Sequence, residues 1–452
     1  MNILIELLLA IFIFGIIASA LITVFFNNQT ALPRASLYLE ALTLGAREMD
    51  KYKHLLSEDF YNNIATTTHA STFEEDITTE EIDNFTKRLI VGFNWFYRKR
   101  PQHLEESTLV SNFNDAIGSH DCWLNGTENW QNAAVSQGPD LGYGNQATAL
   151  WSVGNLVYLT TNNADPRNKL ADPNDLFVIE VKDPANPKIL SALDTGPGLT
   201  SIQVAGSIAY LGNSSINSQL QIADISDPTK PTILKSYKLP GDYSDETTIT
   251  SSLFFHQNFL FLGTAKSQIE ELHIINVSNP TAPAEVGKWE TNAAINSIYG
   301  FSHYLFLATP NNAELTLLDV ATSSKLILLN NFDATGGSGN GKSLARDRSI
   351  LFLGRTVGKS ELYILSLAHL PVLELIGTKT IGDSINALLA LPQRLLLLTN
   401  HNFFIYDSSD LKNLKQIYSL NLPAKGTGLS CSGQTIYISI LNQTGLIIIQ
   451  PK

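Results

Sequence analysis

The 452-residue chain has little charge, and most of its excess charge is negative. Charged residues make up 16% of it, and its 42 acidic against 30 basic residues give a formal net charge of −12. Nucleic-acid binding needs clustered Lys and Arg that neutralise phosphates. The one basic cluster, Arg98-Lys-Arg100, fits the solvated end of a strand. The sequence therefore predicts no nucleic-acid partner.

Patterns typical of catalytic and metal centres are also missing. The nine histidines show no paired metal-ligand spacing, and the chain contains neither HExxH nor a nucleophile elbow. Glu246, Glu270 and Glu271 are conceivable acid or base groups, but solvated loop positions explain them better. We therefore predict no catalytic residue and no cofactor, and a protein that is not an enzyme.

What the sequence has in abundance is a β pattern that recurs seven times over residues 147–452. Each unit holds two apolar strands around a polar turn, then a loop, a third apolar strand, a turn and a short fourth strand. The second strands share an aromatic or leucine anchor that recurs every 40 to 52 residues: Tyr158, Tyr210, Phe261, Phe306, Phe352, Leu397 and Tyr437. This period is typical of propeller blades. The sequence predicts a mainly β fold with a seven-bladed β-propeller.

The third strands and the turns after them carry a family resemblance. Near-continuous apolar runs such as Leu220–Ile225 fit strands that are covered on both faces. Asx-Pro turns follow three of them, at Asp183-Pro184, Asp227-Pro228 and Asn279-Pro280. This combination resembles the LVIVD-repeat family of bacterial surface propellers, most closely in the first three repeats. The resemblance implies a fold and says little about a ligand.

The last repeat lacks its fourth strand, because only three residues follow Ile449. An unpaired sheet edge is unfavourable, and the segment from Trp130 to Ser136 is the obvious donor. We therefore predict that residues within 125–140 pair as the outer strand of the blade built from 425–450. The same closure would bring Cys122 near Cys431. The two cysteines either form a disulfide across the closure or remain separate buried thiols.

The N-terminus predicts a membrane helix. Residues 7–26 contain no charge, and 20 residues are enough to cross a bilayer. The start, Asn2 to Glu6 followed by a long apolar run, resembles the mature N-terminus of type IV pilins and pseudopilins. That resemblance implies that Glu6 pairs with the amino terminus of a neighbouring pilin subunit during pilus assembly. An ordinary signal anchor is the alternative.

The region after this run completes the predicted domain organisation. Apolar residues at helical spacing between Ala35 and Met49 predict that the helix resumes after Pro33 and reaches about residue 56. Residues 81–97 resemble the first β segment of a small pseudopilin head, with a stalk and short hairpin as the alternative. The predicted fold class places a long transmembrane helix and a small pilin-like α+β segment ahead of the propeller. The predicted parts are a transmembrane and stalk helix (1–56), a small pilin-like β segment (57–110), a linker with the ring-closing strand (111–146) and the propeller (147–452).

Two loops contain misleading motifs. Gly336 to Ser343 matches the phosphate-binding loop, whose chemistry requires a following helix N-terminus. Strand, turn and strand follow instead, so we predict a flexible loop with a solvated Lys342. In the first repeat, one long loop rich in Asp and Asn offers oxygen ligands that could hold Ca²⁺, although turn formation alone explains these residues. These weak calcium candidates are Asp165, Asp172, Asn174 and Asp175.

Together these features predict a minor pilin or pseudopilin. Its helix would lie in the cytoplasmic membrane or in an extracellular pilus, and its extracytoplasmic propeller would serve adhesion or bind a protein or glycan. One alternative is a structural pilus cap without a ligand, and another is a cell-surface propeller hydrolase or lyase. Exposed aromatics on a loop face would favour binding. Perturbed carboxylates or histidines over the central channel would favour catalysis.

Overall fold

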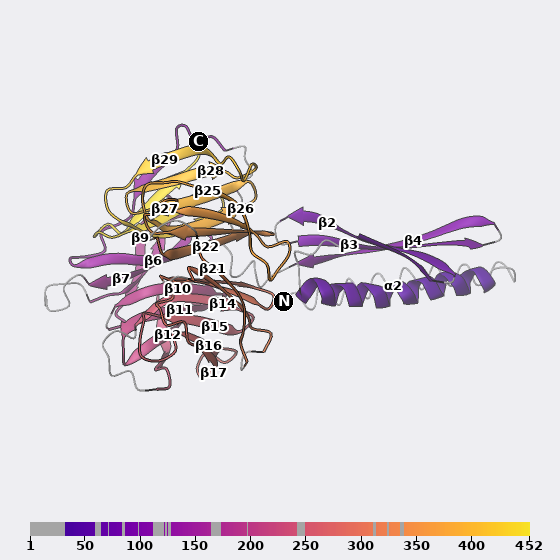
Figure 1. Ribbon diagram of the computed structural model, residues 1–452, viewed down its shortest axis with the longest axis horizontal. Helices are drawn as coiled ribbons and strands as arrows, with labels where there is room; N and C mark the ends of the chain where they lie inside the picture. The colour runs from indigo at the N-terminus through magenta and orange to yellow at the C-terminus, as the bar shows by residue number, and fades with distance from the viewer. Residues whose placement is uncertain are drawn as a thin grey trace. The chain divides into compact units, whose positions relative to one another are not determined.

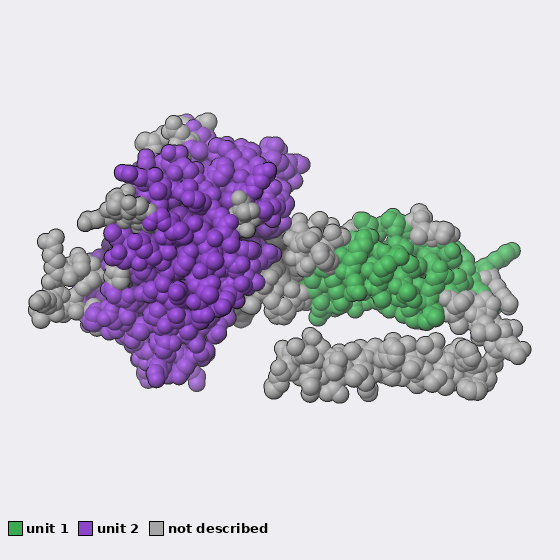
Figure 2. Space-filling view, turned by 90° about the horizontal axis from the view of Figure 1, so that it is seen from below, with its two compact units in different colours: residues 1–113 green, residues 114–452 purple. Residues whose placement is uncertain are grey.

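The computed structural model describes residues 32–58, 65–70, 72–83, 86–97, 99–111, 122, 124, 128–163, 173–196, 198–241, 249–310, 313–322, 325–334 and 339–452. The chain divides into two compact units, Met1–Phe113 and Asn114–Lys452, which Figure 2 shows in different colours. Each unit has its own sheet structure and its own hydrophobic core.

The first unit is one helix on a four-stranded antiparallel meander. Its elements are α2 (Leu32–Glu58), β1 (Ala65–Ala70), β2 (Phe73–Asp83), β3 (Thr86–Tyr97) and β4 (Arg100–Ser111), with the strands paired in chain order. Helix α2 lies along the sheet (Figure 1). Residues 89, 91, 93 and 95 of β3 face the helix side of the core, as the period of two along a strand requires. The predicted β segment 81–97 is in fact divided, since β2 ends at Asp83 and β3 runs from Thr86 to Tyr97.

The predicted fold class needs correction in its N-terminal part. Residues 7–26, with Glu6 before them, lie outside the described residues. Within the part of the chain that the structure describes, no helix has both the length and the apolar character needed to cross a membrane. The fold is mainly β, with four-stranded sheets and one described helix. The predicted fold class is therefore corrected to this mainly β fold, and neither a membrane-spanning helix ahead of the propeller nor a localisation that depends on it is supported by the described structure.

The second unit builds seven four-stranded antiparallel sheets, or blades, from its described residues. In chain order the blades are β6 (Asn145–Val153), β7 (Leu156–Asn163), β8 (Leu176–Glu180) and β9 (Lys188–Leu193); β10 (Leu199–Ala205), β11 (Ile208–Ser215), β12 (Ser218–Asp224) and β13 (Thr232–Tyr237); β14 (Thr250–His256), β15 (Phe259–Thr264), β16 (Leu272–Asn276) and β17 (Ala284–Trp289); β18 (Ser297–Phe301), β19 (Tyr304–Ala308), β20 (Leu315–Asp319) and β21 (Ile327–Phe332); β22 (Gly341–Asp347), β23 (Ile350–Arg355), β24 (Leu362–Ser366) and β25 (Glu374–Lys379); β26 (Ile385–Leu391), β27 (Arg394–Thr399), β28 (Asn402–Asp407) and β29 (Lys415–Asn421); and β30 (Gly426–Ser432), β31 (Thr435–Ile440) and β32 (Leu446–Gln450) with β5 (Ala134–Gln137).

The blades form a closed ring. The first strand of each blade contacts the first strand of the next, and β30 of the seventh blade contacts β6 of the first. Second and third strands are buried almost throughout, because neighbouring blades cover both of their faces. Fourth strands alternate between exposed and half-buried residues, as the outer rim requires. The repeat β-propeller predicted from the sequence is thus the fold of this unit.

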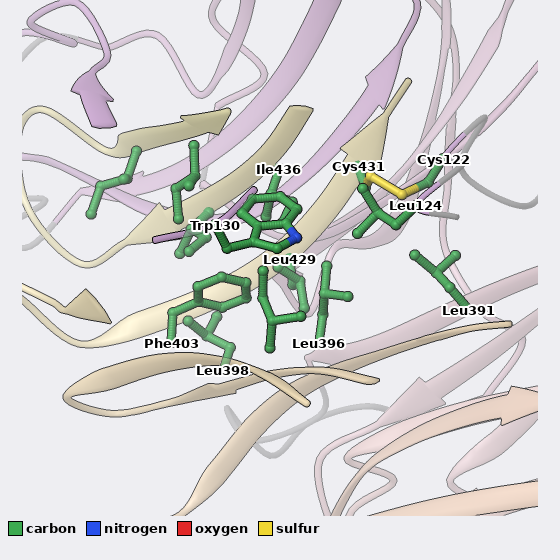
Figure 3. Packing of buried hydrophobic residues seen from close by; sticks show 14 of the residues in the cluster. Cys122, Leu124, Trp130, Leu391, Leu396, Leu398, Phe403, Leu429, Cys431 and Ile436 are labelled. Carbon is green, nitrogen blue, oxygen red and sulfur yellow. A yellow bond between two sulfur atoms is a disulfide. The ribbon is translucent and has the colours of Figure 1, made fainter. Parts of the chain in front are cut away.

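The N-terminal strand of this unit completes its last blade. Strand β5 pairs antiparallel with β32, and Val135 lies opposite Ile449, which confirms the predicted ring closure. Cys122 and Cys431 form a disulfide, with their Cα atoms 5.2 Å apart. Figure 3 shows Trp130 among the apolar side chains beside this bridge, including Leu429 and Phe403. The closure is therefore both covalent and hydrophobic.

Removing the disulfide should destabilise the propeller without changing its fold. The bridged residues are 309 positions apart, and a cross-link that closes so long a loop typically contributes about 2–5 kcal/mol. We expect Cys122→Ala with Cys431→Ala to lower the denaturant midpoint accordingly, and the reduced parent to unfold at the same midpoint as this double variant. Equal midpoints for the variant and the oxidised parent would contradict the expectation.

Candidate binding face and channel mouth

The two faces of the propeller are built differently. In every blade, two residues connect the first strand to the second, and backbones with positive φ make these hairpins tight, as at Gly206 (φ 59°) and Asn258 (φ 69°). We call this side the turn face. The opposite side, the loop face, carries the connections from second to third strands and from each blade to the next. Binding residues are found disproportionately on such loops.

On the turn face, short Asx turns follow the third strands. Asp227 Oδ1 accepts a hydrogen bond from the Thr229 amide (3.0 Å), and Asn279 Oδ1 accepts one from the Thr281 amide (3.1 Å). These are the turns that the Asx-Pro pattern predicts. The aspartates and asparagines at these positions are therefore occupied in shaping the backbone.

Buried polar side chains hold the loop face in five blades. Each stands just before or at the start of a third strand and accepts hydrogen bonds from the segment that follows the fourth strand: Asp175, Gln219, Glu271, Glu314 and Glu361. Glu361 Oε2, for example, accepts from the amides of Ile381 (2.7 Å) and Gly382 (3.0 Å). These clamps satisfy backbone groups that would otherwise be buried without partners.

Asp175, one of the four calcium candidates, is such a clamp. Its Oδ2 accepts hydrogen bonds from the amide (3.2 Å) and hydroxyl (3.0 Å) of Thr195. Asn174 lies beside it, and its carbonyl accepts from the Thr161 hydroxyl (3.2 Å). Asp165 and Asp172 lie outside the described residues. No group of three or more His, Cys, Asp or Glu that could hold a metal ion occurs among the residues described, so calcium binding stays a prediction.

The buried clamp makes stability depend on pH. Burial outweighs the Thr195 hydrogen bonds and raises the pKa of Asp175 from 3.8 to about 6. The folded state then binds more protons than the unfolded state between these values, so this group contributes stability that is lost as pH rises through that window.

Asp175→Asn should remove this dependence, because the amide oxygen can still accept from Thr195 but cannot ionise. We expect the melting temperature of the variant to equal or exceed that of the parent at pH 7, with the difference shrinking between pH 6 and pH 4. A difference that does not change with pH would contradict the assigned pKa shift.

A buried ion pair joins the fourth and fifth blades. The Arg355 guanidinium, which is fully buried, donates through Nη2 to Glu314 Oε1 (2.6 Å) and to the Gly339 carbonyl (3.2 Å). Its Nη1 donates to the Ser360 carbonyl (2.9 Å). One side chain thus ties together three segments of the loop face.

Breaking this pair should be costly because one buried charge would remain alone. We expect Arg355→Met to destabilise the propeller by about 3–5 kcal/mol. Adding Glu314→Gln should restore much of the loss. Denaturant unfolding of the two single variants and the double variant gives the coupling energy, and additive losses would show that the two groups do not stabilise each other.

The mouth of the central channel at the loop face is lined by a ring of β-bulges. In six of the seven first strands, one residue is skipped in the pairing with the second strand. In the fourth blade Asn296 stands directly before β18, at the equivalent position. A bulge redirects a side chain away from the regular strand alternation. The seven ring residues are Thr148, Thr200, Ser251, Asn296, Lys342, Asn386 and Thr427.

Six ring residues bind the next blade. Each donates a side-chain hydrogen bond to a backbone carbonyl at the start of the following first strand: Thr148 to Leu199 (2.8 Å), Thr200 to Thr250 (2.7 Å), Ser251 to Ile295 (2.7 Å), Asn296 to Gly341 (2.7 Å), Asn386 to Gly426 (2.7 Å) and Thr427 to Ala147 (3.0 Å). Between the fifth and sixth blades, Ser343 makes the corresponding bond to Ile385 (3.0 Å).

Lys342 is the exception in the ring. It is half-buried, and its ammonium forms no hydrogen bond or ion pair with any residue that the structure describes. Burial lowers its pKa, and the nearby charge of Lys425 lowers it further, while Asp383 acts in the opposite direction. The predicted fully solvated lysine is therefore wrong. The expectation that no helix follows the motif is right, because Lys342 lies in β22 and a turn and β23 come next.

Exposed apolar side chains also lie in connections of the loop face. Tyr143 is 61% exposed, Val357 55% and Leu441 36%. The Leu441 amide donates to the Lys425 carbonyl (2.8 Å), and the Val357 amide donates to Ser384 Oγ (3.2 Å). Leu441 is therefore held by the segment that precedes β30, and Val357 by the segment that precedes β26. We call these three exposed residues of the loop face the apolar rim, and exposed apolar residues of this kind are suited to contact with another molecule.

Sequence reasoning missed the bulge ring. Its signal is present, because Thr, Ser or Asn recurs near the start of six first strands with the spacing of the second-strand anchors. The bulge itself depends on cross-strand register, however, and Lys342 is hidden within a motif associated with phosphate binding.

The comparisons with known proteins agree with the repeat propeller. The LVIVD repeat model matches residues 200–238 and 258–291, within the second and third blades. No curated protein matches the chain in sequence. Among solved structures, the WD40 repeats of RRP9 superpose with a TM-score of 0.53 at 10% identity, covering 72% of this chain and 99% of that one. A protein from Lactobacillus plantarum superposes with a TM-score of 0.51 at 12% identity, covering 75% and 98%. At such identity the likeness concerns the fold alone.

Proposed function

We propose that the propeller is a binding module that holds another protein on its loop face and catalyses no reaction. The observation that carries this proposal is the loop face, where Tyr143, Val357 and Leu441 are exposed and where Lys342 has no bonded partner among the described residues. Aromatic and aliphatic side chains around a central polar anchor are typical of the residues that contribute most to protein binding.

The chemistry of this rim favours a protein over the other ligands considered. Two of its three exposed apolar residues are aliphatic, whereas flat aromatic surfaces usually bind the faces of sugar rings. The net charge of −12 disfavours nucleic acid. The repeat propeller fold is compatible with interaction, but neither the fold nor the LVIVD match supports a pilin or pseudopilin role.

Site-specific photo-cross-linking tests the proposal in cells that express the protein at its natural level. Tyr143→p-benzoylphenylalanine places the reactive group on the loop face. Val372→p-benzoylphenylalanine is the matched control, because Val372 is 54% exposed and lies in the connection between β24 and β25 on the turn face. We expect a discrete protein adduct from position 143 that is absent from position 372.

A second variant links the adduct to the rim itself. Val357→Ser with Leu441→Ser should reduce the adduct formed from position 143 without lowering the melting temperature, since both side chains are exposed. Equal adducts from both positions, or none from position 143, would refute the proposal.

A further inference from the structure

We propose that the group entering the channel mouth is a carboxylate, supplied by an acidic side chain or the C-terminus of the bound protein, and that Lys342 binds it with Lys425 at the rim. This inference rests on the proposed function, and it names the chemistry that the partner must present. Neither lysine has any role in the ring of hydrogen bonds that holds the blades together.

The first argument comes from the position of Lys342. Six of the seven ring residues bond to the neighbouring blade, and the seventh link is made by Ser343 instead. Lys342 therefore does not form the inter-blade hydrogen bond that its six equivalents form, although it occupies the equivalent position in its first strand. Asn296 binds the carbonyl of Gly341 (2.7 Å), so the backbone just before Lys342 is held in place.

The second argument is that the charged side chain of Lys342 lowers the stability of the folded propeller. Half-burial disfavours the charged ammonium and, with the charge of Lys425, lowers its pKa, and no group among the described residues forms a bond that would offset this cost. The third blade shows what would suit the fold better, because Ser251 and Ser252 both donate to the Ile295 carbonyl (2.7 and 2.9 Å). A residue that opposes stability where a better one fits is typical of a functional site.

The third argument is the charge balance, which favours a monoanion. Among the described residues, the charges that act on Lys342 are the cation of Lys425 and the anion of Asp383. Burial acts to raise the pKa of Asp383, but hydrogen bonds from the side chains of Thr399, His401 (Nδ1, 3.0 Å) and Asn400 (Nδ2, 2.8 Å) outweigh it and hold this pKa below its ordinary value. The net charge of these three groups is one positive unit. A carboxylate neutralises that charge, whereas a dianionic phosphate would overcompensate it beside Asp383.

The test uses the full chain and three probes of defined chemistry: tetraglutamate, tetraglutamine and inorganic phosphate. Only a ligand that prefers the folded state raises the melting temperature. We expect tetraglutamate to raise the melting temperature of the parent and of Lys342→Arg at millimolar concentration, and tetraglutamine to leave both unchanged. Lys342→Ser should lose the shift. Its own melting temperature should match or exceed that of the parent, because it recreates the Ser-Ser pair of the third blade.

Lys230→Ser is the matched control, since Lys230 is exposed on the turn face, and it should keep the full response to tetraglutamate. A shift with phosphate alone would overturn the carboxylate assignment. An equal shift in Lys342→Ser would show that any acidic peptide binding lies elsewhere on the protein.

Cross-linking from position 143 separates failure of this inference from failure of the proposed function. If the adduct persists undiminished in Lys342→Ser, the loop face binds a protein without using the lysine, and only the inference fails. If the parent gives no adduct at all, the proposed function fails with it. Loss of the adduct in Lys342→Ser but not in Lys230→Ser is the result that the inference requires.

Discussion

The pairing of β5 with β32 is the interaction on which the rest of the propeller depends. The seventh blade has only three strands of its own, and an open edge there would expose unpaired backbone groups. Strand β5 supplies the fourth strand, and Trp130 and the Cys122–Cys431 disulfide support the same closure from the segment before it. With the ring closed, every first strand has a neighbour on both sides, and the bulge residues have carbonyls to bind.

Ring closure and the proposed binding surface use different parts of the same strands. Regular pairing along β22 joins it to β23, while its bulge at Lys342 turns one side chain toward the channel mouth. The buried clamps, such as Glu361, fix the loops around that mouth. The loop face can therefore present exposed residues such as Tyr143 from a rigid frame, which reduces the entropy lost when a partner binds.

The sequence predicts most of the propeller and little of its channel mouth. Strand repeats, Asx turns and the missing fourth strand are local patterns, so they lead directly to the blades and to the closure by β5. The bulges arise from register between strands, and the half-burial of Lys342 arises from neighbouring blades. Neither can be obtained from one repeat alone. Hydropathy describes only the length and composition of an apolar run such as residues 7–26. The position of α2 depends instead on tertiary packing, because residues such as Met49 pack on the sheet of the same unit.

The long separation between β5 and β32 also imposes an order in time. A ribosome adds about 5–20 residues per second, so the last blade stays incomplete for on the order of 15 to 60 s after β5 has been made. During that interval the first blades can fold, but the ring cannot close, and both β5 and the growing end expose edges. A protein of this design is therefore most open to misfolding, proteolysis and chaperone binding while it is being synthesised. Its closing strand is among the first parts of the unit to emerge and among the last to be paired.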